Sequence, residues 1–237
     1  MSTFKLTSFH ITMREIIAGT LIIALALYFA FVTVVEPTVS RGQVSETFIT
    51  SLTVTDQIAF QVSPADITMS GPLSGLTGGT SNGQTYFAIS SNNASGYNVT
   101  LTASSSNMEG INAAGNIPFL VASSSGAEPT YDFDSTVQAV NTAGFGYTIE
   151  ASSSLDLDQS FQNDGDNNCN AGSTQTTDKC WAKASTTAFT VVNRSTSTPS
   201  GGIGTDVKFR VVIQPNPAPA IPNDTYRATT TLTATEN

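Results

Sequence analysis

The stretch Tyr97-Asn98-Val99-Thr100-Leu101-Thr102-Ala103 alternates apolar and polar side chains over its whole length. Successive side chains of a β-strand point to opposite faces, so a period of two predicts a strand with one buried and one solvated face. The same alternation recurs in five further runs, which cover residues 48–54, 58–62, 145–151, 207–213 and 226–234. The chain beyond residue 43 is therefore expected to consist of short strands.

Turn-forming residues separate these runs. Asn92-Asn93-Ala94-Ser95-Gly96 is typical of a hairpin-like connection, and four prolines crowd the segment before the last run. No helical period is sustained after the first fifth of the chain. This pattern predicts an all-β fold, an Ig-like antiparallel β-sandwich over residues 47–237 with about nine strands. Two stretches, 103–118 and 155–179, are expected to be long irregular loops.

One apolar run, Ile16 to Val35, precedes these strands and contains no charged residue. A helix of about 20 such residues spans the hydrocarbon core of a bilayer. Lys5 and Arg14 lie before the run, and positive residues remain on the cytoplasmic side. The sequence thus predicts a cytoplasmic tail (1–15), a transmembrane signal-anchor (16–35), a stalk (36–46) and an extracytoplasmic domain (47–237).

Two other interpretations of this run remain open. It is long for a secretory signal peptide, but cleavage after Ser40 or Gly42 would release the domain. A single apolar helix followed by a β-rich domain with a disulfide loop is also the layout of type IV pilins, whose helix packs into a filament. That family has a glycine before its cleavage point and a glutamate at the fifth mature position. Here Glu15 precedes the run and no glycine lies just upstream.

Charge is sparse and uneven in the chain. Only 11% of the 237 residues are charged, and the net charge of −9 divides into +1 up to Arg41 and −10 beyond it. An acidic domain is repelled by phosphate backbones, so the composition disfavours nucleic-acid binding. The only two cysteines are Cys169 and Cys180, and in an exported domain such a pair predicts a disulfide. It would close a loop within residues 155–181.

Two candidate ligand sites lie in or beside this loop. Carboxylates and amides are the oxygen ligands of calcium, and the loop is rich in both, although it lacks the EF-hand spacing. Trp181, the only tryptophan, is a candidate ligand contact, and Tyr86, Tyr97, Tyr131, Tyr147 and Tyr226 could also offer flat faces. Tyr97, Tyr147 and Tyr226 fall on the inward phase of predicted strands. The candidate calcium ligands are Asp156, Asp158, Asp164 and Asp166.

The sequence favours a protein that is not an enzyme and needs no cofactor. The only histidine, His10, falls on the cytoplasmic side, so the domain has no histidine for a Ser–His or Cys–His nucleophile system. Paired carboxylates, Asp132 with Asp134 or Asp156 with Asp158, could still serve an exported carboxylate-dependent hydrolase. That hydrolase is a second alternative, after the pilin-like filament subunit.

Three segments resemble a known kind of sequence. They read Leu76-Thr77-Gly78-Gly79-Thr80-Ser81-Asn82-Gly83, Phe145-Gly146-Tyr147-Thr148-Ile149-Glu150-Ala151 and Ala220-Ile221-Pro222-Asn223-Asp224-Thr225-Tyr226. Together they resemble uncharacterised exported β-sandwich surface proteins of candidate-phylum bacteria with reduced genomes. The last strand is also similar to that of WxL surface domains, without the Trp-x-Leu motif. The resemblance implies a bacterial cell-surface protein and brings no activity.

These observations lead to one expected function. The chain is expected to be a membrane-anchored surface protein with a structural or adhesive role, bound to the membrane through residues 16–35. Its expected partner outside the cell is a surface polymer or another protein.

Overall fold

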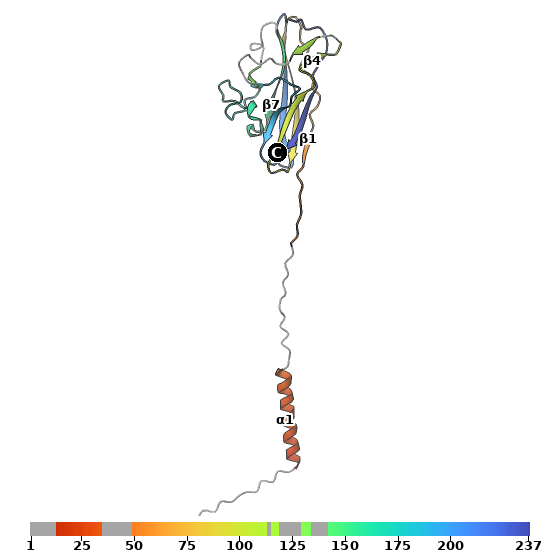
Figure 1. Ribbon diagram of the computed structural model, residues 1–237, viewed down its shortest axis with the longest axis vertical. Helices are drawn as coiled ribbons and strands as arrows, with labels where there is room; N and C mark the ends of the chain where they lie inside the picture. The colour runs from red at the N-terminus through yellow and green to blue at the C-terminus, as the bar shows by residue number, and fades with distance from the viewer. Residues whose placement is uncertain (1–12, 35–48, 113–114, 119–128, 134–141) are drawn as a thin grey trace, which may run out of the picture. The chain divides into compact units, whose positions relative to one another are not determined.

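A computed structural model of the chain describes residues 13–34, 49–112, 115–118, 129–133 and 142–237 (Figure 1). Contacts divide the chain into two units, residues 1–52 and 53–237. The first unit contains helix α1 (Met13–Val34) and the second contains all the strands. The predicted stalk, residues 36–46, and most of the predicted cytoplasmic tail lie outside the described residues.

Helix α1 is long and apolar enough to cross a membrane over Met13–Phe31. It begins three residues earlier than the apolar run and includes Arg14 and Glu15 in its first turn. Over Met13–Phe31 its apolar side chains are exposed on all sides, as those of a lipid-facing helix are. Thr20 donates a hydrogen bond to the carbonyl of Ile16, so its hydroxyl is satisfied within the helix.

The first sheet of the second unit has four antiparallel strands in the order β1-β2-β10-β7. Its strands are β1 (Ile58–Val62), β2 (Gly79–Ser91), β7 (Ala143–Ala151) and β10 (Ile203–Ile213). β10 is one of the two inner strands, paired along its whole length with β2 on one side and over residues 205–213 with β7 on the other.

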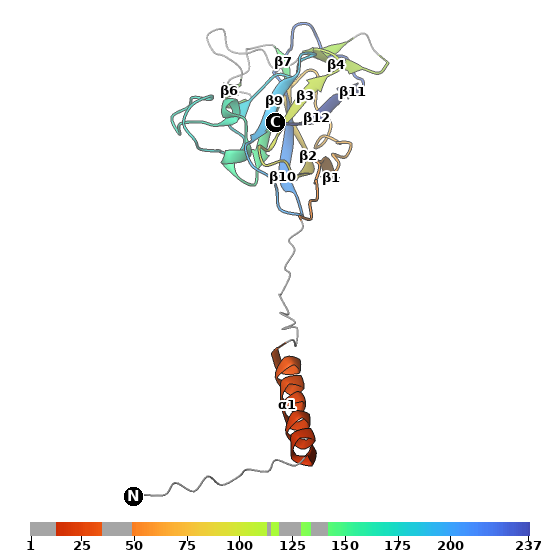
Figure 2. The same cartoon turned by 60° about the horizontal axis from the view of Figure 1, so that its bottom comes forward.

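A second antiparallel sheet has the order β12-β3-β9, and its three strands lie side by side in Figure 2. They are β3 (Tyr97–Ala103), β9 (Phe189–Arg194) and β12 (Thr230–Glu236). Two small sheets complete the unit. One orders β11 (Tyr226–Arg227), β4 (Asn107–Gly110) and β5 (Asn116–Pro118), and the other pairs β6 (Thr130–Tyr131) with β8 (Cys180–Trp181).

The core lies between the two larger sheets, which confirms the predicted antiparallel β-sandwich. Phe87, Val207 and Phe209 of the first sheet belong to the same buried cluster as Val99 and Leu101 of the second. These are the inward phases of alternating strands, as the period of two predicts. The rings of Phe145 and Phe209, on neighbouring strands, stack with centroids 5.6 Å apart.

Several local predictions were wrong. The run at 48–54 was expected to be a strand, but its described residues, 49–54, belong to no strand, and Ile49 and Leu52 are 95% and 87% exposed. β1 begins only at Ile58, because that is where β2 supplies hydrogen-bonding partners. The connection at 92–96 is no hairpin, since β2 and β3 belong to different sheets.

Two further boundaries differ from expectation. The run at 226–234 is divided into β11 and β12, which pair with different sheets. The stretch 103–118, expected to be irregular, contains β4 and β5 in its described part. By contrast, segment 155–179 has no named strand and begins with two 3₁₀ turns, η1 (Ser154–Asp156) and η2 (Gln159–Phe161).

Candidate functional site

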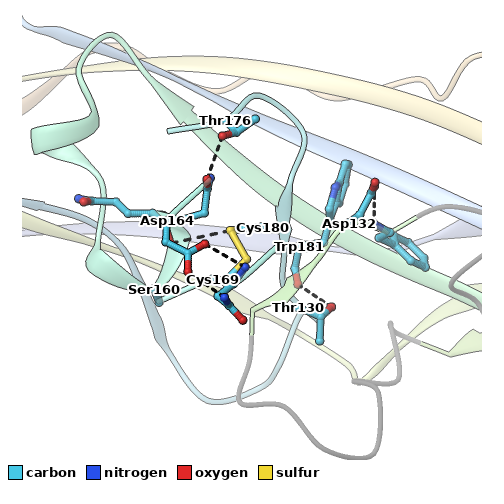
Figure 3. Close-up of a disulfide and its surroundings, with 12 residues drawn as sticks. Thr130, Asp132, Ser160, Asp164, Cys169, Thr176, Cys180 and Trp181 are labelled. Carbon is cyan, nitrogen blue, oxygen red and sulfur yellow. Dashed lines mark hydrogen bonds between the residues drawn. A yellow bond between two sulfur atoms is a disulfide. The ribbon is translucent and has the colours of Figure 1, made fainter. Parts of the chain in front are cut away.

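The predicted disulfide between Cys169 and Cys180 is present and closes a loop beside β7 (Figure 3). The second half of the disulfide loop and the residues just after it are held against the edge of this strand. The Gln175 side chain exchanges hydrogen bonds of 2.8 and 2.9 Å with the backbone of Ala151, and Ala182 pairs its backbone with Tyr147. Residues 175–182 therefore form a wall along one margin of the four-stranded sheet.

Removal of this disulfide should destabilise the domain. The two cysteines are separated by 11 residues, and in the chain-entropy model a loop of this size stabilises the folded state by about 3 kcal/mol. The variant Cys169→Ala/Cys180→Ala is expected to lose about that amount in urea unfolding. Reductant should lower the midpoint of the wild-type chain and leave that of the variant unchanged. Equal midpoints for both chains without reductant would contradict the prediction.

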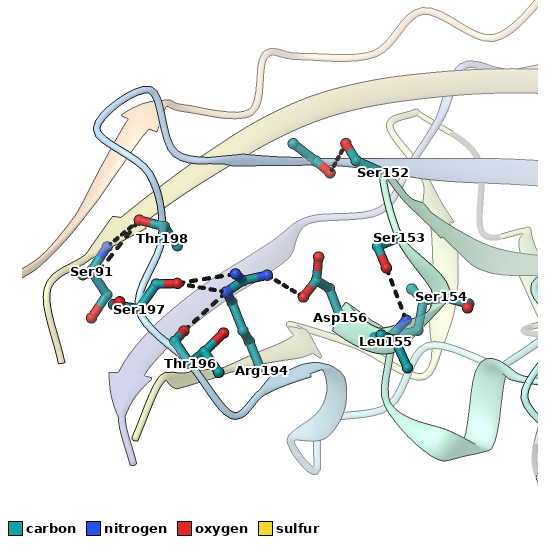
Figure 4. Close-up of polar contacts among 12 residues, drawn as sticks. Ser91, Ser152, Ser153, Ser154, Leu155, Asp156, Arg194, Thr196, Ser197 and Thr198 are labelled. Carbon is teal, nitrogen blue, oxygen red and sulfur yellow. Dashed lines mark hydrogen bonds and ion pairs between the residues drawn. The ribbon is translucent and has the colours of Figure 1, made fainter. Parts of the chain in front are cut away.

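The four candidate calcium ligands have separate roles. Asp156 is buried and forms an ion pair with Arg194, which also donates to the carbonyls of Thr196 and Ser197 (Figure 4). Asp158 caps η2 by accepting from the backbone and hydroxyl of Ser160.

Asp164 accepts hydrogen bonds from the Asn168 side chain and from the backbone N–H of Asp166, which lower the pKa of its carboxyl. Within the described ranges, no three His, Cys, Asp or Glu side chains gather as a group that could hold a metal ion. The acidic loop residues thus form turns and caps in this structure.

The ion pair of Asp156 and Arg194 is adjacent to Tyr97 of β3. Burial, with the negative charge of Asp156, raises the pKa of the Tyr97 hydroxyl to about 12, and Arg194 acts in the opposite direction. This tyrosine is therefore a neutral core residue at physiological pH, as its inward phase predicts.

Trp181, the candidate ligand contact, is only 1% exposed. Its ring packs edge to face with Phe133 at 5.9 Å, and the Arg210 guanidinium lies 4.4 Å from the ring centroid. Its indole N–H donates to the carbonyl of Asp178 at 2.9 Å. The side chain is therefore almost fully covered by a core contact and a cation, and only a small part of it lines the hollow that Lys208 and Arg210 also line.

The four-stranded sheet presents a different candidate site on the face opposite the core. Because Val207, Phe209 and Val211 of β10 point inward, the alternate residues of this strand point outward. The strand register places them in three rows across β2 and β10, and side chains directly opposite one another share a face. We call these six residues the polar strip: Tyr86 opposite Asp206, Gln84 opposite Lys208, and Asn82 opposite Arg210.

Charges of opposite sign alternate along and beside the polar strip. Lys208 forms ion pairs with Glu150 of β7 and, at 3.2 Å, with Asp178 of the wall. Burial acts against the charge of Lys208, but hydrogen bonds to these carboxylates raise its pKa. The hydrogen bond from Lys208 lowers the pKa of Glu150, whereas burial and then the charge of Glu150 raise the pKa of Asp206.

Arg210 is held in place at the other end of the polar strip. Its Nε donates to the Asn82 side chain at 2.8 Å and its Nη1 donates to the Phe133 carbonyl at 2.6 Å. Among the residues that the structure describes, no carboxylate pairs with it. Its guanidinium is therefore held in place, and several of its N–H groups have no acceptor in the described part of the chain.

Tyr86 begins the polar strip as an exposed aromatic side chain. A Cβ at Gly204 would lie 2.2 Å from the Tyr86 hydroxyl oxygen and within 2.7 Å of two ring carbons. The ring therefore lies directly against the backbone of Gly204, and the residue remains 45% exposed. Beyond it, a hollow of about 340 Å³ lies between the wall and Ser70, and Gln84, Lys208 and Arg210 are among its lining residues.

The carboxylate pairs suggested by the sequence are placed differently from expectation. Asp132 pairs with Lys179 at 3.1 Å, and its suggested partner Asp134 lies outside the described residues. Asp156 and Asp158 lie on and beside a 3₁₀ turn rather than on a strand. Glu150 and Asp206, which lie opposite each other on β7 and β10, belong to no sequence motif and are brought together by the strand register.

Comparisons with family models, with curated proteins and with solved structures find no match to this chain.

Proposed function

We propose that the chain is a single-pass membrane protein whose β-sandwich lies outside the cytoplasm and has a non-enzymatic structural or adhesive role. The observation that carries the proposal is the Cys169–Cys180 disulfide in a domain that follows an exposed apolar helix. Disulfides persist in oxidising compartments, and an apolar helix surface requires lipid. The positive residues Lys5 and Arg14 before the apolar stretch support a cytoplasmic N-terminus.

The orientation can be tested by protease treatment of intact cells that express the full chain. External protease should digest the domain without lysis, and mass spectrometry should find an intact N-terminus in the membrane fraction. The variant Lys5→Gln/Arg14→Gln leaves Arg41 as the positive charge nearest the helix, so a substantial fraction should insert in the opposite orientation and become protected. Protection of the wild-type domain would contradict the proposal. A shortened N-terminus would show that the apolar segment is cleaved, and would favour a released protein or a filament subunit.

A further inference from the structure

The polar strip has the features of a binding surface for a ring-shaped, hydroxylated ligand. Tyr86 exposes an aromatic ring that packs against the backbone of Gly204, and this contact reduces the side-chain entropy that binding would cost. The face of an aromatic ring is weakly negative, so it attracts the C–H groups on the apolar face of a saturated ligand ring. From the row of Tyr86 to the row of Asn82 the strands rise by about 14 Å, enough for a short oligosaccharide.

Hydrogen-bonding groups continue from Tyr86 into the hollow. The Gln84 amide is exposed and has no partner among the described residues, so it can donate and accept. Arg210 keeps N–H groups that no described residue accepts, and Asp178, whose Oδ1 is paired with Lys208, also lines the hollow. Donors and acceptors of this kind can bind the hydroxyls of a sugar, and the hydrogen bonds made by the charged Arg210 would be the stronger ones.

The charge of the surface selects among saccharides. Asp206, Glu150 and Asp178 outnumber Lys208 and Arg210, and the chain beyond Arg41 carries a net charge of −10. A polyanionic saccharide would be repelled, whereas an uncharged one meets only hydrogen-bonding partners. We propose that the polar strip binds a neutral oligosaccharide, with its first ring on Tyr86 and the following rings toward Arg210. This inference rests on the proposed adhesive role and names its ligand class.

The test uses the full chain purified in an amine-oxide detergent, because glycosidic detergents would compete for the site. Isothermal titration calorimetry with cellohexaose, xylohexaose, mannohexaose and chitohexaose should detect binding of at least one of them. Tyr86→Ala should weaken this binding about tenfold or more, whereas Tyr86→Phe should retain it within about twofold. Gly204→Ala should also weaken it, because the new methyl group displaces the Tyr86 ring. Leu76→Ala, which removes an exposed apolar side chain outside the polar strip, is the matched control.

Three results would overturn the inference. The first is that none of the four neutral oligosaccharides binds at millimolar concentration, and the second is that the wild-type chain and Tyr86→Ala bind with equal affinity. The third is that the chain binds only oligogalacturonate, a polyanionic saccharide titrated in the same way. Because the titration uses purified protein, it is independent of the side of the membrane on which the domain lies. Failure here and failure of the protease test are therefore distinguishable.

Discussion

Replacement of Trp181 by alanine is expected to lower the free energy of unfolding of the domain by about 4 kcal/mol. The side chain is almost fully buried, and it contacts Phe133, Val212 and the guanidinium of Arg210. Its removal would leave a cavity and would also free Arg210, so the cation would lose the surface on which it lies. The loss can be measured by urea unfolding followed by far-UV circular dichroism, since the variant has no tryptophan fluorescence.

Two further variants make this prediction specific. Trp181→Phe retains an aromatic ring and should lose clearly less stability than Trp181→Ala. Leu155→Ala removes a side chain that is 79% exposed and should change the unfolding free energy by no more than about 0.5 kcal/mol. A loss of unfolding free energy below about 1 kcal/mol for Trp181→Ala would mean that the indole is not a core residue. That result would favour a role for Trp181 in ligand contact.

The second large effect is expected at the ion pair of Asp156 and Arg194. Asp156→Ala leaves the partly buried Arg194 without its carboxylate, and removal of one partner of a buried pair typically costs about 3–5 kcal/mol. Arg194 also donates to the carbonyls of Thr196 and Ser197, so its displacement would loosen the turn that follows β9. Urea unfolding of the single variants Asp156→Ala and Arg194→Ala would measure both losses.

The matched double variant separates the charge from the packing. Asp156→Leu/Arg194→Met replaces both charges by apolar side chains of similar size, and such replacements are often neutral. It should therefore recover most of the stability that Asp156→Ala loses. If the double variant is as unstable as the sum of the two single variants, the ion pair is not the reason for the loss.

The sequence predicted the fold class because, in several runs that form core strands, every second residue is apolar along the whole run. The runs at 97–103, 145–151 and 207–213 correspond to β3, β7 and β10, whose alternating residues meet in one cluster. β2 escaped detection, although it is the longest strand, because its first half contains Gly79, Ser81 and Gly83 in place of large apolar residues. These small residues are covered from elsewhere: Ile67 and Met69 lie against the position of Gly83.

The candidate site was less predictable than the fold. Tyr86 was one aromatic residue among several in the sequence, and only the strand register reveals that it shares a face with Asp206 and Gln84. Lys208, Glu150 and Asp178 come from three separate parts of the chain and meet only in the folded domain. Trp181 was chosen as a ligand contact because it is the only tryptophan, but a sequence does not show that Phe133 and Arg210 cover it.

The position of β10 in the four-stranded sheet has a kinetic consequence. This strand lies between β2 and β7, yet it follows both in the chain, and it is separated from β2 by on the order of a hundred residues. Until residues 203–213 pair as β10, β2 and β7 each have an unpaired edge, and the core lacks the inward side chains of β10. Pairings this distant in sequence are slow to form, typically in milliseconds to seconds. The domain is therefore expected to remain unfolded through most of its synthesis and to acquire its structure in one late, cooperative step.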